Sequence, residues 1–185
     1  MGFSFGGSTA VGFVLGCPWA VSSVVLLAPA GLIRAEVLGE RCWGLLEEDG
    51  GREEEAREAV LDTLEGGTLI VPDDWRARSQ KGEVVAEALR QWELDEHGGY
   101  RYSVFSMFRD GAAIGCEEEF RRMGKEKGKK LVVLGEKDDL CTKQQLVELG
   151  FEADGVKVVV GAGHALGRTH TNVVAELIIA FWGGL

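Results

Sequence analysis

Residues 2–7 read GFSFGG, in which a serine stands between two glycines at the spacing G-x-S-x-G. A serine between a strand end and a helix start occupies a sharp, strained turn, and we expect Gly2 and Gly6 to let the two backbones approach closely. The next residues, STAVGFVLGCP, predict a buried helix that ends before Pro18. Its N-terminus would lie beside the Ser4 hydroxyl and favour a developing oxyanion. For these five residues alone, an ordinary glycine-rich turn is the alternative.

Three short apolar runs predict the buried strands of a parallel sheet. They are residues 22–28, 131–134 and 156–160, and helical patterns follow the second and third, KQQLVELGF and TNVVAELIIAFW. Alternation of strand and helix indicates an α/β sheet. Such sheets carry their chemistry in the loops beyond the carboxyl ends of the strands, and Asp138 and His164, like Ser4, fall in loops of that kind.

The order serine, acid, histidine and the sequences around these residues resemble the α/β-hydrolase superfamily. GFSFGG is similar to its nucleophile elbow, VVLLAPAG to the strand that follows, LGEKDDL to the acid turn and GAGHAL to the histidine turn. The resemblance covers residues 1–34 and 128–185. It implies the C-terminal portion of an α/β-hydrolase fold, with a mostly parallel sheet of about three core strands and a helical cap inserted at residues 35–127. The chain looks most like small capped esterases, lipases and carbon–carbon bond hydrolases, and LLAPAGLIR is similar to fungal members.

The resemblance also implies a function, that of a serine hydrolase cleaving an ester or related carbonyl substrate through a Ser-His-Asp triad and an acyl-enzyme. Ser4 would be the nucleophile, His164 the base and Asp138 the acid that holds the imidazole. Asp138 is preferred to Asp139 because the family's acid stands three residues after the glycine that ends the strand. The backbone N–H of Phe5 would supply one oxyanion donor. An epoxide hydrolase is disfavoured, since that branch has an aspartate at the nucleophile position.

The insertion has amphipathic helical patterns of its own. An acidic stretch begins with the residues LLEEDGG. A second amphipathic helix is predicted at GEVVAEALRQWELDEH, where the spacing of the large apolar residues predicts a buried face; they are Val84, Val85, Leu89 and Trp92. The stretch YRYSVFSMFRDGAA carries bulky apolar side chains that suit a substrate pocket and a plain core equally well. A last helix, CEEEFRRMGKEKG, leads back to the sheet. His97 and His170 lie in polar, turn-like stretches and are not predicted to be the base.

Composition excludes several classes of function. A net charge of −10 over 185 residues argues against nucleic acid as a partner. Pro18 and Pro29 interrupt the apolar residues 10–33, so no membrane span is predicted. GAGHALG lacks the spacing of a dinucleotide fingerprint, and no cofactor is expected. The cysteines have no metal-ligand spacing and predict buried thiols in a reducing, cytoplasmic location, with no metal; they are Cys17, Cys42, Cys116 and Cys141.

Four or five strands precede the elbow in the family that the chain resembles, whereas here GFSFGG stands at residue 2. We therefore expect an N-terminally truncated hydrolase without the loop that supplies the second oxyanion donor. Residues 22–28 are then expected to have an unpaired apolar edge. A truncated, non-catalytic α/β-hydrolase fragment is the alternative to an active serine hydrolase.

Overall fold

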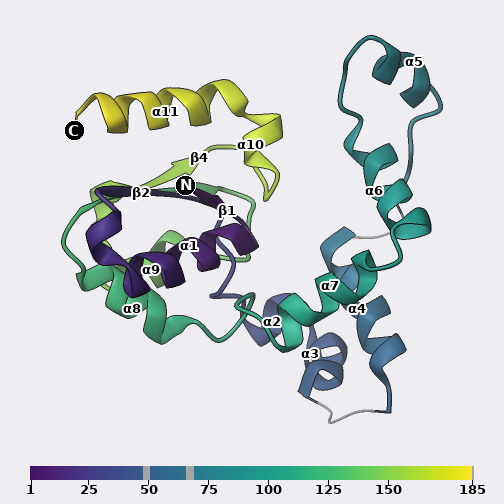
Figure 1. Cartoon of the computed structure of the whole chain (residues 1–185), viewed down its shortest axis with the longest axis horizontal. Helices are drawn as coiled ribbons and strands as arrows, with labels where there is room; N and C mark the ends of the chain where they lie inside the picture. Colours follow the sequence, from purple (N-terminus) through teal and green to yellow (C-terminus); the bar gives the residue numbers. More distant parts are fainter. Residues whose placement is uncertain (48–50, 66–68, 185) are drawn as a thin grey trace. The chain divides into compact units, whose positions relative to one another are not determined.

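The computed structural model describes residues 1–47, 51–65 and 69–184, without the side chains of residues 63–65. It divides into two compact units, one formed by residues 1–37 and 112–185 and the other by residues 38–111 (Figure 1). The first unit contains the sheet and the second is helical. Among the described helices, none is long and apolar enough to cross a membrane.

The sheet of the first unit has four parallel strands in the order β1-β2-β3-β4. Their bounds are Gly2–Phe3 (β1), Ser23–Leu27 (β2), Lys129–Gly135 (β3) and Val156–Val159 (β4). The expectation of an α/β fold with a parallel sheet is confirmed, and β2, β3 and β4 correspond to the three predicted strands. The structure adds β1, whose two residues pair with Leu26 and Leu27. The expectation of an unpaired edge is therefore wrong at these two residues of β2.

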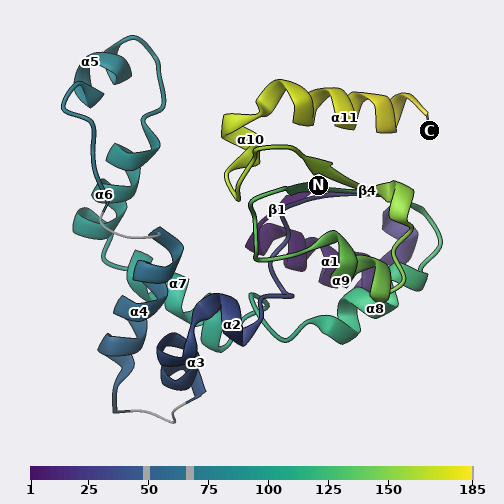
Figure 2. The ribbon, with the colours of Figure 1, turned by 180° about the vertical axis from the view of Figure 1, so that it is seen from behind.

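Helices cover both faces of this sheet, as Figures 1 and 2 show. On one face lie α1 (Phe5–Gly16), α8 (Glu117–Lys125) and α9 (Lys143–Glu148); on the other lie α10 (Leu166–Thr169) and α11 (Thr171–Gly183). Two short 3-10 helices, Pro18–Ala20 and Ala153–Gly155, precede β2 and β4.

Side chains alternate along the central strands, so both faces of the sheet are buried. Leu26 and Val132 pack into the cluster under α1 and α8, whereas Leu27 and Val133 pack into the cluster under α11. A strand buried on both faces has no polar side to expose. The near-continuous apolar runs of the sequence follow from this double burial.

The sheet unit resumes at Ala112, earlier than the boundary expected after residue 127. The reason is α8, which packs against α1. Its apolar residues Phe120 and Met123 are fully buried in the same cluster as Val11 of α1. Burial in that cluster assigns α8 to the sheet unit and limits the separate helical unit to residues 38–111.

The helical unit is built around α4, which packs against α3 and α7. The elements of this region are α2 (Ala35–Leu38) at its border, α3 (Glu40–Glu47), α4 (Glu53–Glu65), α5 (Trp75–Gln80), α6 (Ala86–Glu96) and α7 (Tyr100–Arg109). On α7, Phe105 and Phe108 are buried, while Tyr102 is exposed. The expected burial of Trp92 is wrong: its side chain is 54% exposed and lines an open groove of about 330 Å³ with Val71 and Trp75. The expected burial is also wrong for Val84, which is exposed, and for Leu89, which is half-exposed, whereas Val85 is buried as expected.

Candidate functional site

Ser4 lies in the turn between β1 and α1, in a backbone conformation that few residues other than glycine adopt. Its φ is 52° and its ψ is −124°. Three backbone hydrogen bonds hold this conformation. Ser4 N donates to Leu27 O at 3.0 Å, and Ser4 O accepts from Gly7 N at 2.8 Å and from Ala30 N at 2.9 Å. The surrounding chain thus stabilises a strained serine, a situation that is concentrated at functional sites.

The glycines around Ser4 differ in their packing. A Cβ on Gly2 would lie 2.1 Å from the carbonyl oxygen of Gly6, so the absence of a side chain at Gly2 allows strand and helix to meet. No such constraint exists at Gly6, where a Cβ would have nothing within 4 Å. The expectation that Gly6 is needed for close approach is therefore wrong. Gly7 has that property instead, since its Cβ would lie 2.6 Å from Cβ of Pro29.

The structure brings Ser4, His164 and Asp138 together. His164 Nε2 lies 2.9 Å from Ser4 Oγ, and His164 Nδ1 lies 2.9 Å from Asp138 Oδ2. A carboxylate only accepts hydrogen bonds, so Nδ1–H donates to Asp138 and Nε2 is left to accept from the Ser4 hydroxyl. Asp139, the alternative acid, is exposed. The three residues form one continuous chain of hydrogen bonds across 160 positions of sequence.

Both carboxylate oxygens of Asp138 accept hydrogen bonds. Its side chain is 2% exposed, and Oδ1 accepts a hydrogen bond from Leu140 N at 3.2 Å. Next to it, burial and the Asp138 charge raise the pKa of the Cys141 thiol to about 12. Cys141 is therefore a neutral thiol at physiological pH, and it lacks the thiolate that a nucleophile requires.

Phe5 is the first residue of α1. Amides in the first turn of a helix have no partner within the helix, which leaves the Phe5 N–H available beside Ser4. Its carbonyl oxygen accepts from Ser8 Oγ at 2.9 Å and from Thr9 Oγ1 at 3.1 Å. The amide expected to serve an oxyanion thus lies at a helix N-terminus, where the helix dipole favours negative charge.

Sequence reasoning missed the contact of Phe3 with His164. The two rings lie with their centroids 5.3 Å apart and their planes at 32°. Alternation along β1 puts the side chain of Phe3 on the face opposite the buried Gly2. Nothing in the local sequence identifies the neighbour on that face as a histidine 161 positions later, because that neighbour depends on strand order.

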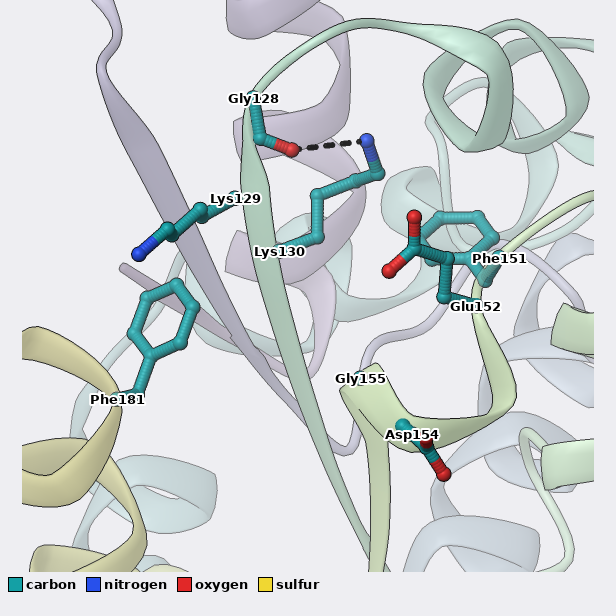
Figure 3. Close-up of a pocket in the computed structure, with 8 residues that line it drawn as sticks. All are labelled: Gly128, Lys129, Lys130, Phe151, Glu152, Asp154, Gly155 and Phe181. Carbon is teal, nitrogen blue, oxygen red and sulfur yellow. Dashed lines mark hydrogen bonds between the residues drawn. The ribbon is translucent and has the colours of Figure 1, made fainter. Parts of the chain in front are cut away.

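A cavity of about 540 Å³ opens at the N-terminal end of β3, the end opposite the Asp138 loop (Figure 3). Its lining includes Lys129, Lys130, Glu152 and Phe181. The ammonium of Lys130 donates to the carbonyl oxygen of Gly128, drawn as the dashed line in Figure 3. Lys129 begins β3 and the Asp138 loop follows its end, so a strand of seven residues, about 20 Å long, separates the cavity from His164. The cavity is not part of the site around Ser4.

Among the residues that the structure describes, no group of three or more His, Cys, Asp or Glu side chains lies close enough together to hold a metal ion.

No family model matches this chain, and neither does any curated protein. Solved structures do match it. A meta-cleavage product hydrolase from Pseudomonas fluorescens is 22% identical with a TM-score of 0.59, over 99% of this chain and 63% of that one. A thermophilic esterase from Thermogutta terrifontis is 13% identical with a TM-score of 0.60, over 99% and 63%. An α/β hydrolase from a deep-sea metagenome library is 15% identical with a TM-score of 0.59, over 98% and 63%.

The present chain thus spans about 63% of the length of the solved structures that it resembles. At these identities the likeness establishes the fold. It confirms the fold that the sequence implied, that of part of an α/β hydrolase.

Proposed function

Because this chain has the fold of the α/β hydrolases, we propose that it acts as a serine hydrolase on an ester or related carbonyl substrate. Many chemistries occur on one fold, so the proposal depends on the site. The observation that supports it is the chain of hydrogen bonds from Ser4 through His164 to Asp138, with 2.9 Å on each side of the imidazole. A hydroxyl, a base and an orienting carboxylate in this geometry are the elements of an activated nucleophile.

Acylation begins when Ser4 Oγ attacks the carbonyl carbon of the substrate and its proton passes to His164 Nε2. The Asp138 carboxylate stabilises the imidazolium that forms. Negative charge develops on the former carbonyl oxygen, where the Phe5 N–H donates a hydrogen bond. The tetrahedral species then collapses, the bond to the leaving oxygen breaks, and that oxygen takes the proton from Nε2. An acyl group remains on Ser4.

Deacylation repeats these steps with water as the nucleophile. Water attacks the acyl carbon and gives a proton to His164 Nε2, and a second tetrahedral species forms. Its collapse breaks the bond to Ser4 Oγ, which recovers the proton from Nε2. The products are a carboxylic acid and the alcohol released earlier, and the site returns to its starting state without a cofactor or a metal.

The proposed substrate is a small molecule with a hydrolysable carbonyl group. Proteins of similar structure bear the names esterase and meta-cleavage product hydrolase, so ester and carbon–carbon bond cleavage both suit this fold. We propose that residues 38–111 are the helical cap insertion of the fold, because they form a separate helical unit inserted between β2 and β3. The thiols of Cys17, Cys116 and Cys141 are free, which supports a reducing, cytoplasmic location.

The test is labelling by a fluorophosphonate, which reacts with activated serines. We expect the wild-type protein to be labelled at Ser4 and the Ser4→Ala variant to remain unlabelled. Ser22→Ala is the matched control, because this exposed serine precedes β2 at the opposite end of that strand from Ser4, and it should be labelled like the wild type. A folded wild-type protein that never reacts would contradict the proposal and support a non-catalytic fragment instead.

A further inference from the structure

Backbone contacts join the loop after β3 to the loop after β4, beside the pair formed by His164 and Asp138. Glu136 N donates to Val159 O at 3.0 Å and so continues the pairing of the two strands by one residue. Lys137 N donates to Ala162 O at 2.8 Å. The loop that carries Asp138 and the loop that carries His164 therefore lie against each other along their backbones.

Gly135 makes this approach possible. A Cβ at this position would lie 2.6 Å from the carbonyl oxygens of both Ala162 and Gly163, closer than real Cβ atoms come to other heavy atoms. The two loops consequently meet backbone against backbone, directly before His164. Small displacements of one loop would be transmitted to the other, because no flexible side chain lies between them at this point.

A side chain adds one more contact between the loops. Glu136 Oε2 accepts a hydrogen bond from Gly161 N at 2.8 Å. A carboxylate that accepts from a backbone amide makes a stronger bond than a neutral acceptor does. Gly161 has a φ of 75° and lies in the turn after β4, three residues before His164. The Glu136 carboxylate thus binds a residue of the turn that leads to the imidazole.

We propose that Glu136 is a positioning residue for the reaction, holding the His164 turn in register with the Asp138 loop. This inference rests on the proposed function, because register affects a rate only if Ser4, His164 and Asp138 react. The imidazole has contacts of 2.9 Å on both sides, and an error of about 1 Å on either side would take a contact beyond hydrogen-bonding distance. Glu136 is itself exposed, so replacing it should leave the fold intact.

The experiment compares Glu136→Ala, Glu136→Gln and Lys137→Ala with the wild type. We expect Glu136→Ala to lower the fluorophosphonate labelling rate and kcat for p-nitrophenyl acetate by about tenfold, with KM and the melting temperature nearly unchanged. Glu136→Gln loses the charge but keeps an oxygen acceptor, so most of the rate should return. Lys137→Ala is the control, since its backbone bond to Ala162 survives the change, and it should react like the wild type.

Hydrogen exchange of the Gly161 amide, followed by NMR, tests the contact without any catalysis. Exchange should be slow in the wild type and Glu136→Gln and faster in Glu136→Ala. Equal exchange in all three proteins would overturn the inference, as would a Glu136→Gln variant that reacts as slowly as Glu136→Ala. Wild-type labelling at Ser4 with full reactivity in Glu136→Ala would overturn the inference and leave the proposed function standing. A wild-type protein that is not labelled would remove the proposed function, and the inference would fall with it.

Discussion

Alanine at Gly2 should damage both stability and reactivity, and the size of the effect follows from one close contact. Its Cβ would lie 2.1 Å from the carbonyl oxygen of Gly6 and 2.6 Å from the carbonyl carbon, against a lower limit of 3.0 Å for real Cβ atoms. The backbones must therefore separate by roughly 1 Å, which in a packed interior costs about 3 kcal/mol. Because Ser4 lies between these backbones, the same displacement should lower its labelling rate by about 100-fold.

Gly6→Ala is the matched control, since it changes the other glycine of the same motif. Its Cβ would have nothing within 4 Å, and Gly6 lies within α1. Alanine in a helix should raise the free energy of unfolding by about 0.5–1 kcal/mol relative to glycine. Urea denaturation and fluorophosphonate labelling of both variants measure the two effects. If Gly2→Ala were as stable and as reactive as Gly6→Ala, the close approach of strand and helix would not support Ser4 as we describe.

Three further predictions concern single side chains. Ser4→Gly should abolish labelling yet raise the free energy of unfolding by about 1 kcal/mol, because glycine adopts a φ of 52° without strain; an unchanged urea midpoint would contradict this. Asp138→Asn keeps an acceptor for Leu140 N but no longer holds His164 in the required tautomer, so kcat/KM should fall by about 10⁴-fold, and a loss below tenfold would count against Asp138 as the acid. The pKa of the Cys141 thiol is about 12 in the folded protein, above its ordinary value of 9.0. The neutral thiol therefore adds its full contribution to the free energy of unfolding below pH 9, and this contribution is lost as the pH rises from 9 towards 12. Between pH 8 and pH 10 in urea denaturation, the wild type should therefore lose about 1 kcal/mol more stability than Cys141→Ala, and equal losses would contradict the shift.

The sequence predicted β2, β3 and β4 because each is a short, mostly apolar run. β2 and β3 are buried on both faces, whereas Lys157 and Val158 of β4 are exposed. Residues 131–134 are apolar without interruption, and the structure explains this, since Val132 and Val133 enter clusters on opposite sides of the sheet. The remaining strand, β1 (Gly2–Phe3), has only two residues and therefore shows no periodicity in the sequence. Its identity as a strand depends on pairing with Leu26 and Leu27, which no local pattern contains.

Other features depended on tertiary packing. The motif indicated that glycine was needed near Ser4, but the position of Pro29 decides that Gly7 is confined while Gly6 is open. Likewise, the sequence predicted a helix at α8 that leads back to the sheet without identifying what it packs against, and the burial of Phe120 in the sheet unit follows from the path of the chain. The sequence was sufficient to predict which residues stand in the loops after the strands. It was not sufficient to predict which of these loops contact each other.

The site consists of two parts, each held together by its own hydrogen bonds. Three backbone bonds within residues 4–30 fix the strained Ser4, and the bonds of Glu136 and Lys137 fix the His164 turn to the Asp138 loop. The sheet sets the distance between the parts. β2 and β3 pair in register, and Ala28 N extends this pairing by donating to Val133 O at 2.8 Å. A change within one part should therefore alter reactivity without altering the other part's internal contacts. A slip between β2 and β3 would separate Ser4 from His164 even with both parts intact, so the apolar register of the central strands is as much a condition of the proposed chemistry as the three polar side chains are.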